Sequence, residues 1–341
     1  MLFRSRRDPA GPRLAWSGTA LTVRFEGTSL GLRLLELPKP DGPPLHGVRA
    51  PNRFRFSVDG APFRDLYLGE ERLLYRVAEG LAPGVHLLRL EKETEPAVGE
   101  TQLLGLELDP GGRLRPPPPA APRQLEFIGD SGLTGYGIEG KDAQCSFSVE
   151  TQAWSRTWVA LTAKALGAEA STLAFSGKGV SVNYGDEPGP TLPVLYERTL
   201  PSREDGPWDF SAWTPDAVLL QAGANDFWKE HPGEERFRGA YRALVERIRA
   251  HHPQAHIVCV LGSGISDAYP KDLQARTRAR ALITEVVDAL NQAGDARVHF
   301  AEVPPSLKEE GLGCGWHASG RTHQRTAEQL TPLLRAWLGW P

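Results

Sequence analysis

Residues 127–137 read FIGDSGLTGYG and place Ser131 between an aspartate and a glycine, directly after an apolar run. A serine hydroxyl is a weak nucleophile unless the backbone exposes it and a base takes its proton. A glycine-rich turn at the end of a strand can provide the exposure. The stretch therefore predicts a buried strand that ends at a turn carrying a reactive serine, and a base must come from elsewhere in the chain.

The chain around and beyond this stretch alternates between strand-like and helix-like segments. Apolar runs predict buried strands at 125–128, 217–220, 257–261 and 298–303. Apolar residues at helical spacing predict helices around 154–166, 237–248, 273–290 and 322–338. This alternation predicts an α/β domain with a parallel sheet covered on both faces. Ligands of such sheets bind beyond the carboxyl ends of the strands, which is where Ser131 falls.

The first third of the chain has a different period. Between residues 14 and 108, apolar and polar residues alternate in short runs separated by Gly and Pro turns, as at Leu21, Val23 and Phe25. This pattern predicts a β-sandwich. The tract LRPPPPAAPRQ at 114–124 favours a stiff linker over a proline-rich ligand for a partner. We therefore expect domains at 1–113 and 125–341, joined by a linker at 114–124.

The charge and hydropathy of the chain limit the kinds of binding partner that are expected. The 341 residues carry 39 Lys and Arg against 42 Asp and Glu, a net charge of -3, so no nucleic-acid partner is expected. The basic run Arg4, Arg6 and Arg7 is expected to be a solvated tail. No apolar segment is long enough to span a membrane. The start has no apolar core of a signal peptide, so the protein is expected to be cytoplasmic or to lack its leader here.

Three cysteines, Cys145, Cys259 and Cys314, lie far apart in the sequence. An odd number at wide spacing favours neither a disulfide framework nor a zinc site, so ordinary buried or half-buried residues are expected. No spacing of histidines and acids suggests a metal, and no cofactor is expected.

Three more short blocks stand near predicted strand ends or before the last helix: AFSGKG at 174–179, QAGANDF at 221–227 and GCGWHASG at 313–320. Together with the first block they resemble the SGNH (GDSL-type) hydrolase superfamily, and more narrowly carbohydrate esterase family 2. The resemblance implies a flavodoxin-like SGNH hydrolase domain preceded by a jelly-roll sandwich, and removal of acetyl groups from sugar hydroxyls of plant polysaccharides. Members are generally secreted.

The matching residues are Ser131, Gly177, Asn225 and His317. Acyl transfer needs donors aimed at a developing oxyanion. The backbone N–H groups of Ser131 and Gly177 and the side-chain amide of Asn225 would supply them, although Asn225 could instead cap a helix. His317, 186 positions after Ser131, would act as the base.

The histidine block departs from the superfamily pattern. Cys314 stands three positions before His317, where many members carry an aspartate, and Gly315 offers no carboxylate either. We therefore expect a Ser-His dyad whose imidazole is oriented by a backbone carbonyl, as in some members of the family. His323 is the rival base, but its place near a helix start favours capping or packing.

Aromatic residues near the blocks suggest a sugar site, because flat aromatic faces suit pyranose rings. Tyr136, Trp228 and Trp316 are expected to bind substrate, whereas Phe227 is expected to pack in the core. Asp130 is expected to bond local backbone at the strand end.

The leading interpretation is a monomeric serine esterase that hydrolyses O-acetyl esters on carbohydrates through an acetyl-enzyme. One alternative is a lipase-like or thioesterase-like acyl hydrolase acting on a non-carbohydrate ester. Another is an inactive carbohydrate-binding protein, which would not need all four blocks.

Overall fold

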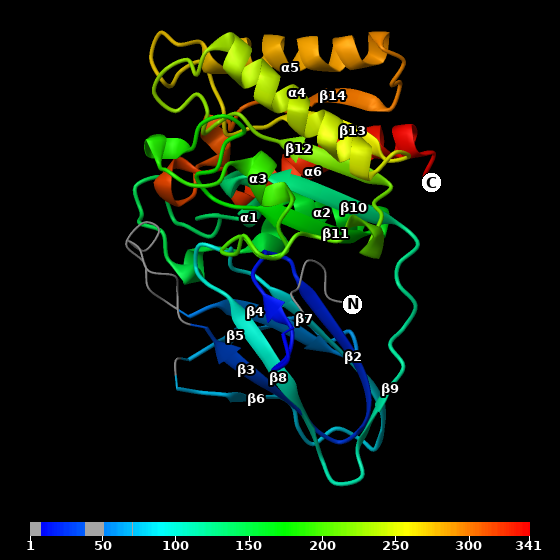
Figure 1. Ribbon diagram of the computed structural model, residues 1–341. Coiled ribbons are helices and arrows are strands. Elements are labelled where there is room, and N and C mark those ends of the chain that lie inside the picture. The colour runs from blue at the N-terminus through cyan, green and yellow to red at the C-terminus, as the bar shows by residue number, and fades with distance from the viewer. Residues whose placement is uncertain (1–7, 38–50, 70) are drawn as a thin grey trace.

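The computed structural model of this chain describes residues 8–37, 51–69 and 71–341. Figure 1 shows two units: strands of the first third of the chain, in blue to cyan, lie below a sheet and its helices, in green to red. The basic run Arg4, Arg6 and Arg7 lies outside the described residues. Within them, no helix combines the length and apolar composition that crossing a membrane would require.

The first unit is a sandwich of two antiparallel sheets, as the period of two predicts. A 4-stranded sheet has the order β1-β8-β3-β6 and a 5-stranded sheet the order β5-β4-β7-β2-β9. Their side chains meet in one core, in which Phe25, Leu32, Phe54 and Leu88 are fully buried. The strands are β1 (Arg13–Leu14), β2 (Ala20–Gly27), β3 (Leu30–Glu36), β4 (Arg53–Val58), β5 (Arg64–Tyr67), β6 (Leu74–Ala78), β7 (Gly84–Lys92), β8 (Thr101–Leu108) and β9 (Arg113–Arg115).

The second unit is built on a 5-stranded parallel sheet of order β11-β10-β12-β13-β14. Its strands are β10 (Gln124–Gly129), β11 (Glu169–Ala174), β12 (Ala217–Gln221), β13 (His256–Leu261) and β14 (Val298–Glu302). The helices are α1 (Ser131–Thr134), α2 (Trp158–Leu166), α3 (Leu192–Tyr196), α4 (Glu234–His251), α5 (Ala275–Gln292) and α6 (Gly320–Leu338). The α/β class expected from the sequence is confirmed.

Strand β12 shows why the sheet is covered on both faces. Val218 and Leu220 point into a core shared with α3, α4 and α5, whereas Ala217 and Leu219 point into a core shared with α2 and α6. A strand with both faces buried reads as a continuous apolar run. The run at 217–220 was recognisable for this reason.

Helix α4 contains its expected range, and α6 begins two residues before its expected range. Helix α5 begins and ends two residues later than expected. Two other segments differ more. The helix expected over 154–166 is divided, because a 3-10 turn (Trp154–Arg156) precedes Thr157, whose side chain caps α2. Strand β11 was not expected, since its sequence EASTLA lacks a run of large aliphatic residues.

The link between the units is shorter than the proline tract. Strand β9 includes Leu114 and Arg115, which pair with β2, and β10 begins at Gln124. Residues 116–123 contain no helix or strand and run as an extended segment in Figure 1. The division into 1–113, 114–124 and 125–341 remains our proposal.

Strand order decides where a site can form. The chain passes from β10 outward to β11 and then returns to the other side of β10 as β12. A crevice forms beyond the carboxyl ends of strands at such a reversal. The first three blocks follow β10, β11 and β12, so the topology brings them to this crevice.

Candidate active site

Ser131 is the first residue of α1, two positions after the end of β10. Asp130 caps this helix, because its Oδ1 accepts a hydrogen bond of 3.0 Å from the Gly132 N–H. Burial raises the pKa of Asp130 to about 7. The expected structural role of Asp130 at the strand end is thus confirmed: it holds the turn that presents Ser131.

His317 meets Ser131 across 186 positions of sequence, with 2.8 Å between His317 Nε2 and Ser131 Oγ. The other ring nitrogen, Nδ1, lies 3.2 Å from the carbonyl oxygen of Cys314 and 3.0 Å from that of Gly315. An N–H at Nδ1 that donates to these carbonyls leaves Nε2 as the acceptor of the serine proton. The carbonyl contact expected from the sequence is present.

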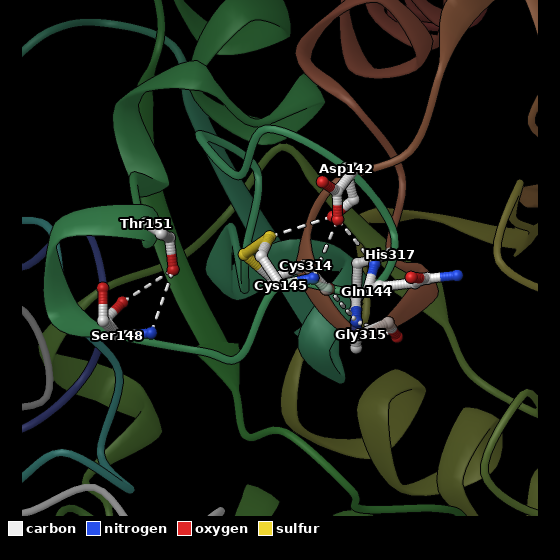
Figure 2. Close-up of a disulfide and its surroundings, with 8 residues drawn as sticks. All are labelled: Asp142, Gln144, Cys145, Ser148, Thr151, Cys314, Gly315 and His317. Carbon is white, nitrogen blue, oxygen red and sulfur yellow. Dashed lines mark hydrogen bonds between the residues drawn. A yellow bond between two sulfur atoms is a disulfide. The ribbon is translucent and has the colours of Figure 1, made fainter.

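The cysteine expectation is wrong for two of the three residues. Cys145 and Cys314 form a disulfide (Figure 2). Cys259 is free and buried in the sheet, as expected. The two cysteines are 169 positions apart, so their spacing gave no sign of pairing. The available signal was their position, since Cys314 lies inside the histidine block and Cys145 lies shortly after the serine block.

The disulfide is one of three links between the segment 137–145 and the turn before His317. The Cys314 N–H donates to the Gly137 carbonyl at 3.0 Å, and the Trp316 N–H donates to the Ala143 carbonyl at 3.2 Å. Asp142 Oδ1 stabilises the turn at Cys145 by accepting from its N–H at 2.9 Å (Figure 2). The carbonyls that orient His317 therefore belong to a turn that is anchored by three links.

Two glycines permit this close approach. A Cβ at Gly137 would lie 2.7 Å from the Cys314 carbonyl oxygen, and one at Gly140 would lie 2.7 Å from Cys145 Sγ. Atoms cannot pack at such distances, so larger residues would push the two segments apart. This explains one glycine of FIGDSGLTGYG.

Asn225 follows β12, as expected, and Gly177 follows β11, the strand that the sequence did not predict. Gly177 has φ of +80°, which favours glycine, whereas a Cβ there would meet only Tyr184 Cβ, at 3.9 Å. Asn225 Nδ2 donates to the Lys178 carbonyl at 2.9 Å and to Asp130 Oδ2 at 3.2 Å, so it links the three blocks. Asp226 accepts from the N–H groups of residues 180–182 and fixes the loop after Gly177.

The aromatic residues fall into two groups. Tyr136 is buried and its ring lies 4.2 Å from the imidazole of His317, so this burial favours a supporting role over substrate contact. Trp316 is 71% exposed beside His317, and Trp228 is half-buried against Tyr184 at 5.1 Å. Phe227 is buried against Phe237, which confirms its expected core position.

The rival base His323 is buried, and its Nδ1 accepts from the Trp158 N–H at 3.1 Å. Burial lowers the pKa of His323 to about 3. It therefore packs α6 against α2 in the neutral form, as expected for a structural residue.

Two further features of the candidate site are a nearby pocket and the arrangement of side chains that could bind a metal. A pocket of about 550 Å³ lies beside the histidine turn, lined by residues 140–143, 306–308, 310–312 and 319. Within the part of the chain that the structure describes, no three His, Cys, Asp or Glu side chains gather as metal ligands do.

Each of the two units matches the model of a known protein family. The model of the carbohydrate esterase 2 N-terminal family matches residues 4–118, and that of the GDSL-like lipase/acylhydrolase family matches residues 127–331. The fold and these matches define the class of the chain, that of GDSL-type carboxylic ester hydrolases.

Solved structures narrow the class. A family two carbohydrate esterase from Clostridium thermocellum, in complex with cellohexaose, superposes with a TM-score of 0.90 and 34% identity, over 100% of this chain and 99% of that one. A family 2 enzyme from Corynascus thermopiles gives 0.86 and 30% over 99% of both chains. The chain belongs to carbohydrate esterase family 2.

Curated relatives include the cellulase/esterase CelE of Acetivibrio thermocellus, which is 36% identical over 98% of this chain. The chain spans only 38% of the length of CelE. The acetylxylan esterase / glucomannan deacetylase of Cellvibrio japonicus is 27% identical, over 96% of this chain and 86% of its own length.

Proposed function

We propose that this chain removes O-acetyl groups from carbohydrates through a Ser131–His317 dyad and an acetyl-enzyme. The contact of 2.8 Å between Ser131 Oγ and His317 Nε2 carries this proposal. It joins two blocks from opposite ends of the catalytic unit at the crevice where Gly177 and Asn225 also lie. A nucleophile with an adjacent, oriented base is the arrangement that serine acyl transfer requires.

The reaction begins when Ser131 Oγ attacks the acetyl carbonyl carbon and its proton passes to His317 Nε2. As the tetrahedral intermediate collapses, the bond to the sugar oxygen breaks and His317 returns the proton to that oxygen. Water, deprotonated by His317, then attacks the carbonyl carbon of the acetyl-serine. As the bond to Ser131 Oγ breaks, His317 returns the proton to Oγ and acetate is released. The carbonyls of Cys314 and Gly315 hold the imidazole in place during both steps.

The negative oxygen of the intermediate is bound by the backbone N–H groups of Ser131 and Gly177 and by Asn225 Nδ2. Both hydrogens of this amide already have acceptors in the structure. The bond to Asp130 Oδ2, at 3.2 Å, is the longer of the two. We infer that Asn225 exchanges this bond for one to the oxyanion as the intermediate forms.

A carbohydrate substrate is favoured by the relatives and by Trp316. Their names include an acetylxylan esterase / glucomannan deacetylase and a complex with cellohexaose. Trp316 has φ of +65°, a costly conformation for a bulky residue, and it leaves the indole exposed beside the base. We assign Trp316 and Trp228 to sugar contacts and Tyr136 to support of the imidazole.

Acetate release from acetylated xylan, acetylated glucomannan and 4-nitrophenyl acetate tests this function. The wild type should act on all three, and Ser131→Ala should lower kcat by at least about a thousand-fold. Ser211→Ala, at an exposed serine bonded to Asp209, is the matched control and should leave kcat unchanged.

The same assay separates the alternatives. A preference for nitrophenyl esters of longer acids, with no release from the polysaccharides, would favour a lipase-like or thioesterase-like hydrolase. Folded protein without any activity would point to a binding role. Full activity in Ser131→Ala would refute the proposed nucleophile.

A further inference from the structure

The loop that follows β7 carries charged side chains from the sandwich into the catalytic unit. Lys92, the last residue of β7, and Glu93 and Glu95, in the loop itself, are each at most 1% exposed and lie where the two units meet. Lys92 Nζ donates to the carbonyl oxygens of Thr94 at 2.9 Å and Glu95 at 3.3 Å. An ammonium group bound in this way fixes the course of the loop, because an unpaired buried charge is very costly.

Glu95 ends in the loop that carries Gly177. Its Oε2 accepts from the Ser176 N–H at 2.8 Å, and its Oε1 accepts from Ser176 Oγ at 2.6 Å. Ser176 directly precedes Gly177, so the carboxylate fixes the peptide unit next to the one whose N–H faces the oxyanion in the proposed mechanism.

The same carboxylate is connected to the helix of the nucleophile. Gln152 Nε2 lies 3.2 Å from Glu95 Oε1 and 3.3 Å from the carbonyl oxygen of Thr134, the last residue of α1. Thr134 Oγ1 also lies 3.4 Å from Ser176 Oγ. Glu95 therefore joins the segments that present two of the three oxyanion donors, those of Ser131 and Gly177.

The negative charge of Glu95 does not explain why this residue lies beside the proposed oxyanion hole. Burial raises the pKa of Glu95, and a carboxylate near the oxyanion hole cannot stabilise a second negative charge. Its three hydrogen bonds can instead hold the donors in a fixed geometry before the reaction. Such preorganisation is a major source of oxyanion stabilisation.

We propose that Glu95 of the sandwich is a positioning residue that holds Ser176 and Gly177 in the geometry of the oxyanion hole. The sandwich thereby completes the active site of the other unit. This inference rests on the proposed function, because it requires Gly177 to be an oxyanion donor.

Glu93 provides a matched control. It is buried on the same loop, but its carboxylate accepts from the Ser155 N–H at 2.9 Å and pairs with Arg55 at 3.1 Å. It thus joins the two units without bonding Ser176. Replacing Glu93 should disturb the interface as much as replacing Glu95 while leaving the oxyanion loop in place.

The test compares Glu95→Ala, Glu95→Gln and Glu93→Gln in the full chain, below the lowest Tm of the set. Glu95→Ala should lower kcat on 4-nitrophenyl acetate by about ten- to a hundred-fold with KM changed less than about two-fold. It should weaken inhibition by a boronic acid, a mimic of the tetrahedral intermediate, by a similar factor. Glu95→Gln keeps one acceptor for the Ser176 N–H and should lose less, and Glu93→Gln should stay within about two-fold of the wild type.

Equal kcat and equal boronate affinity in folded Glu95→Gln and Glu93→Gln would overturn the positioning role, even if Glu95→Ala failed to fold. Ser131→Ala, measured alongside, separates the two claims. If Ser131→Ala is inactive and the Glu95 variants keep full kcat, only the positioning role fails. If Ser131→Ala stays active, the proposed function fails and the positioning role with it.

Discussion

The two ring nitrogens of His317 have separate roles that follow from their partners. Nε2 faces the serine hydroxyl, whereas Nδ1 faces main-chain carbonyls where many hydrolases place a carboxylate. A neutral carbonyl fixes the tautomer but stabilises the imidazolium less than a carboxylate does. Fixed geometry, supplied by the anchored turn and by the Tyr136 ring, is therefore central to this site.

Among individual residues, the candidate catalytic residues were predictable from the sequence because they lie in recognisable blocks. They are Ser131, Gly177, Asn225 and His317. Glu95 was not predictable, since it belongs to no block and its partner Ser176 is 81 positions away. Its role depends on packing between units, which periodicity does not describe.

His323 gives a pH-dependent prediction. Its pKa is about 3 in the folded chain and near 6.5 when exposed, so between these values the unfolded chain binds a proton that the folded chain does not. The free energy of unfolding should therefore fall as the pH drops through this window, by up to about 1.4 kcal/mol per pH unit. His323→Asn keeps an acceptor for the Trp158 N–H and should show a weaker pH dependence.

Urea unfolding from pH 4 to 7 measures this difference. Parallel curves for the wild type and His323→Asn would show that His323 is not held neutral. The kcat of the variant should match that of the wild type, and a loss as large as that of His317→Ala would instead make His323 the base.

Among the elements, the turn before His317 and the segment 137–145 act together. Three links join them, and only the disulfide is covalent. Helices α4, α5 and α6 were predictable because apolar residues recur along one face, whereas this pairing of loops depends on where the sheet places its strand ends. The disulfide could not be predicted for the same reason.

Replacing both Cys145 and Cys314 by alanine should release this turn. We expect the free energy of unfolding to fall by about 2–4 kcal/mol. We also expect kcat to fall by about ten-fold, because a misplaced base reduces turnover. Steady-state kinetics and urea unfolding measure both effects, and a reductant should reproduce them in the wild type.

Cys259→Ala is the control, since this buried thiol lies in β13 away from the turn. It should lower stability by leaving a cavity but should leave kcat unchanged. A double alanine variant with the kcat of the wild type would show that the disulfide does not orient His317.

In the whole molecule, the sandwich and the catalytic unit share buried contacts. Trp16 inserts into the core of the catalytic unit, and its Nε1 donates to the Thr199 carbonyl at 2.8 Å. Arg53 of β4 pairs with Glu139 at 2.9 Å and donates to the Gln152 carbonyl at 3.1 Å. The change of period near residue 114 indicated two units, but nothing in the sequence indicated how tightly they join.

These contacts predict that both units unfold in one transition. Calorimetric and van't Hoff enthalpies should agree for the wild type. Trp16→Ala should lower the free energy of unfolding by about 3–5 kcal/mol. Trp16→Phe should lower it by less, because a phenyl ring still fills part of the space of the indole. Two separate transitions in the wild type would contradict this coupling.

The central claim is that the fold presents Ser131 as the residue that becomes acetylated. Rapid quenching of the reaction with 4-nitrophenyl acetate, followed by mass spectrometry of the digested protein, tests it most directly. We predict an acetyl group on the peptide that contains Ser131, formed with a burst of nitrophenol and absent from Ser131→Ala. Sustained turnover with the acetyl group on another residue would contradict the claim.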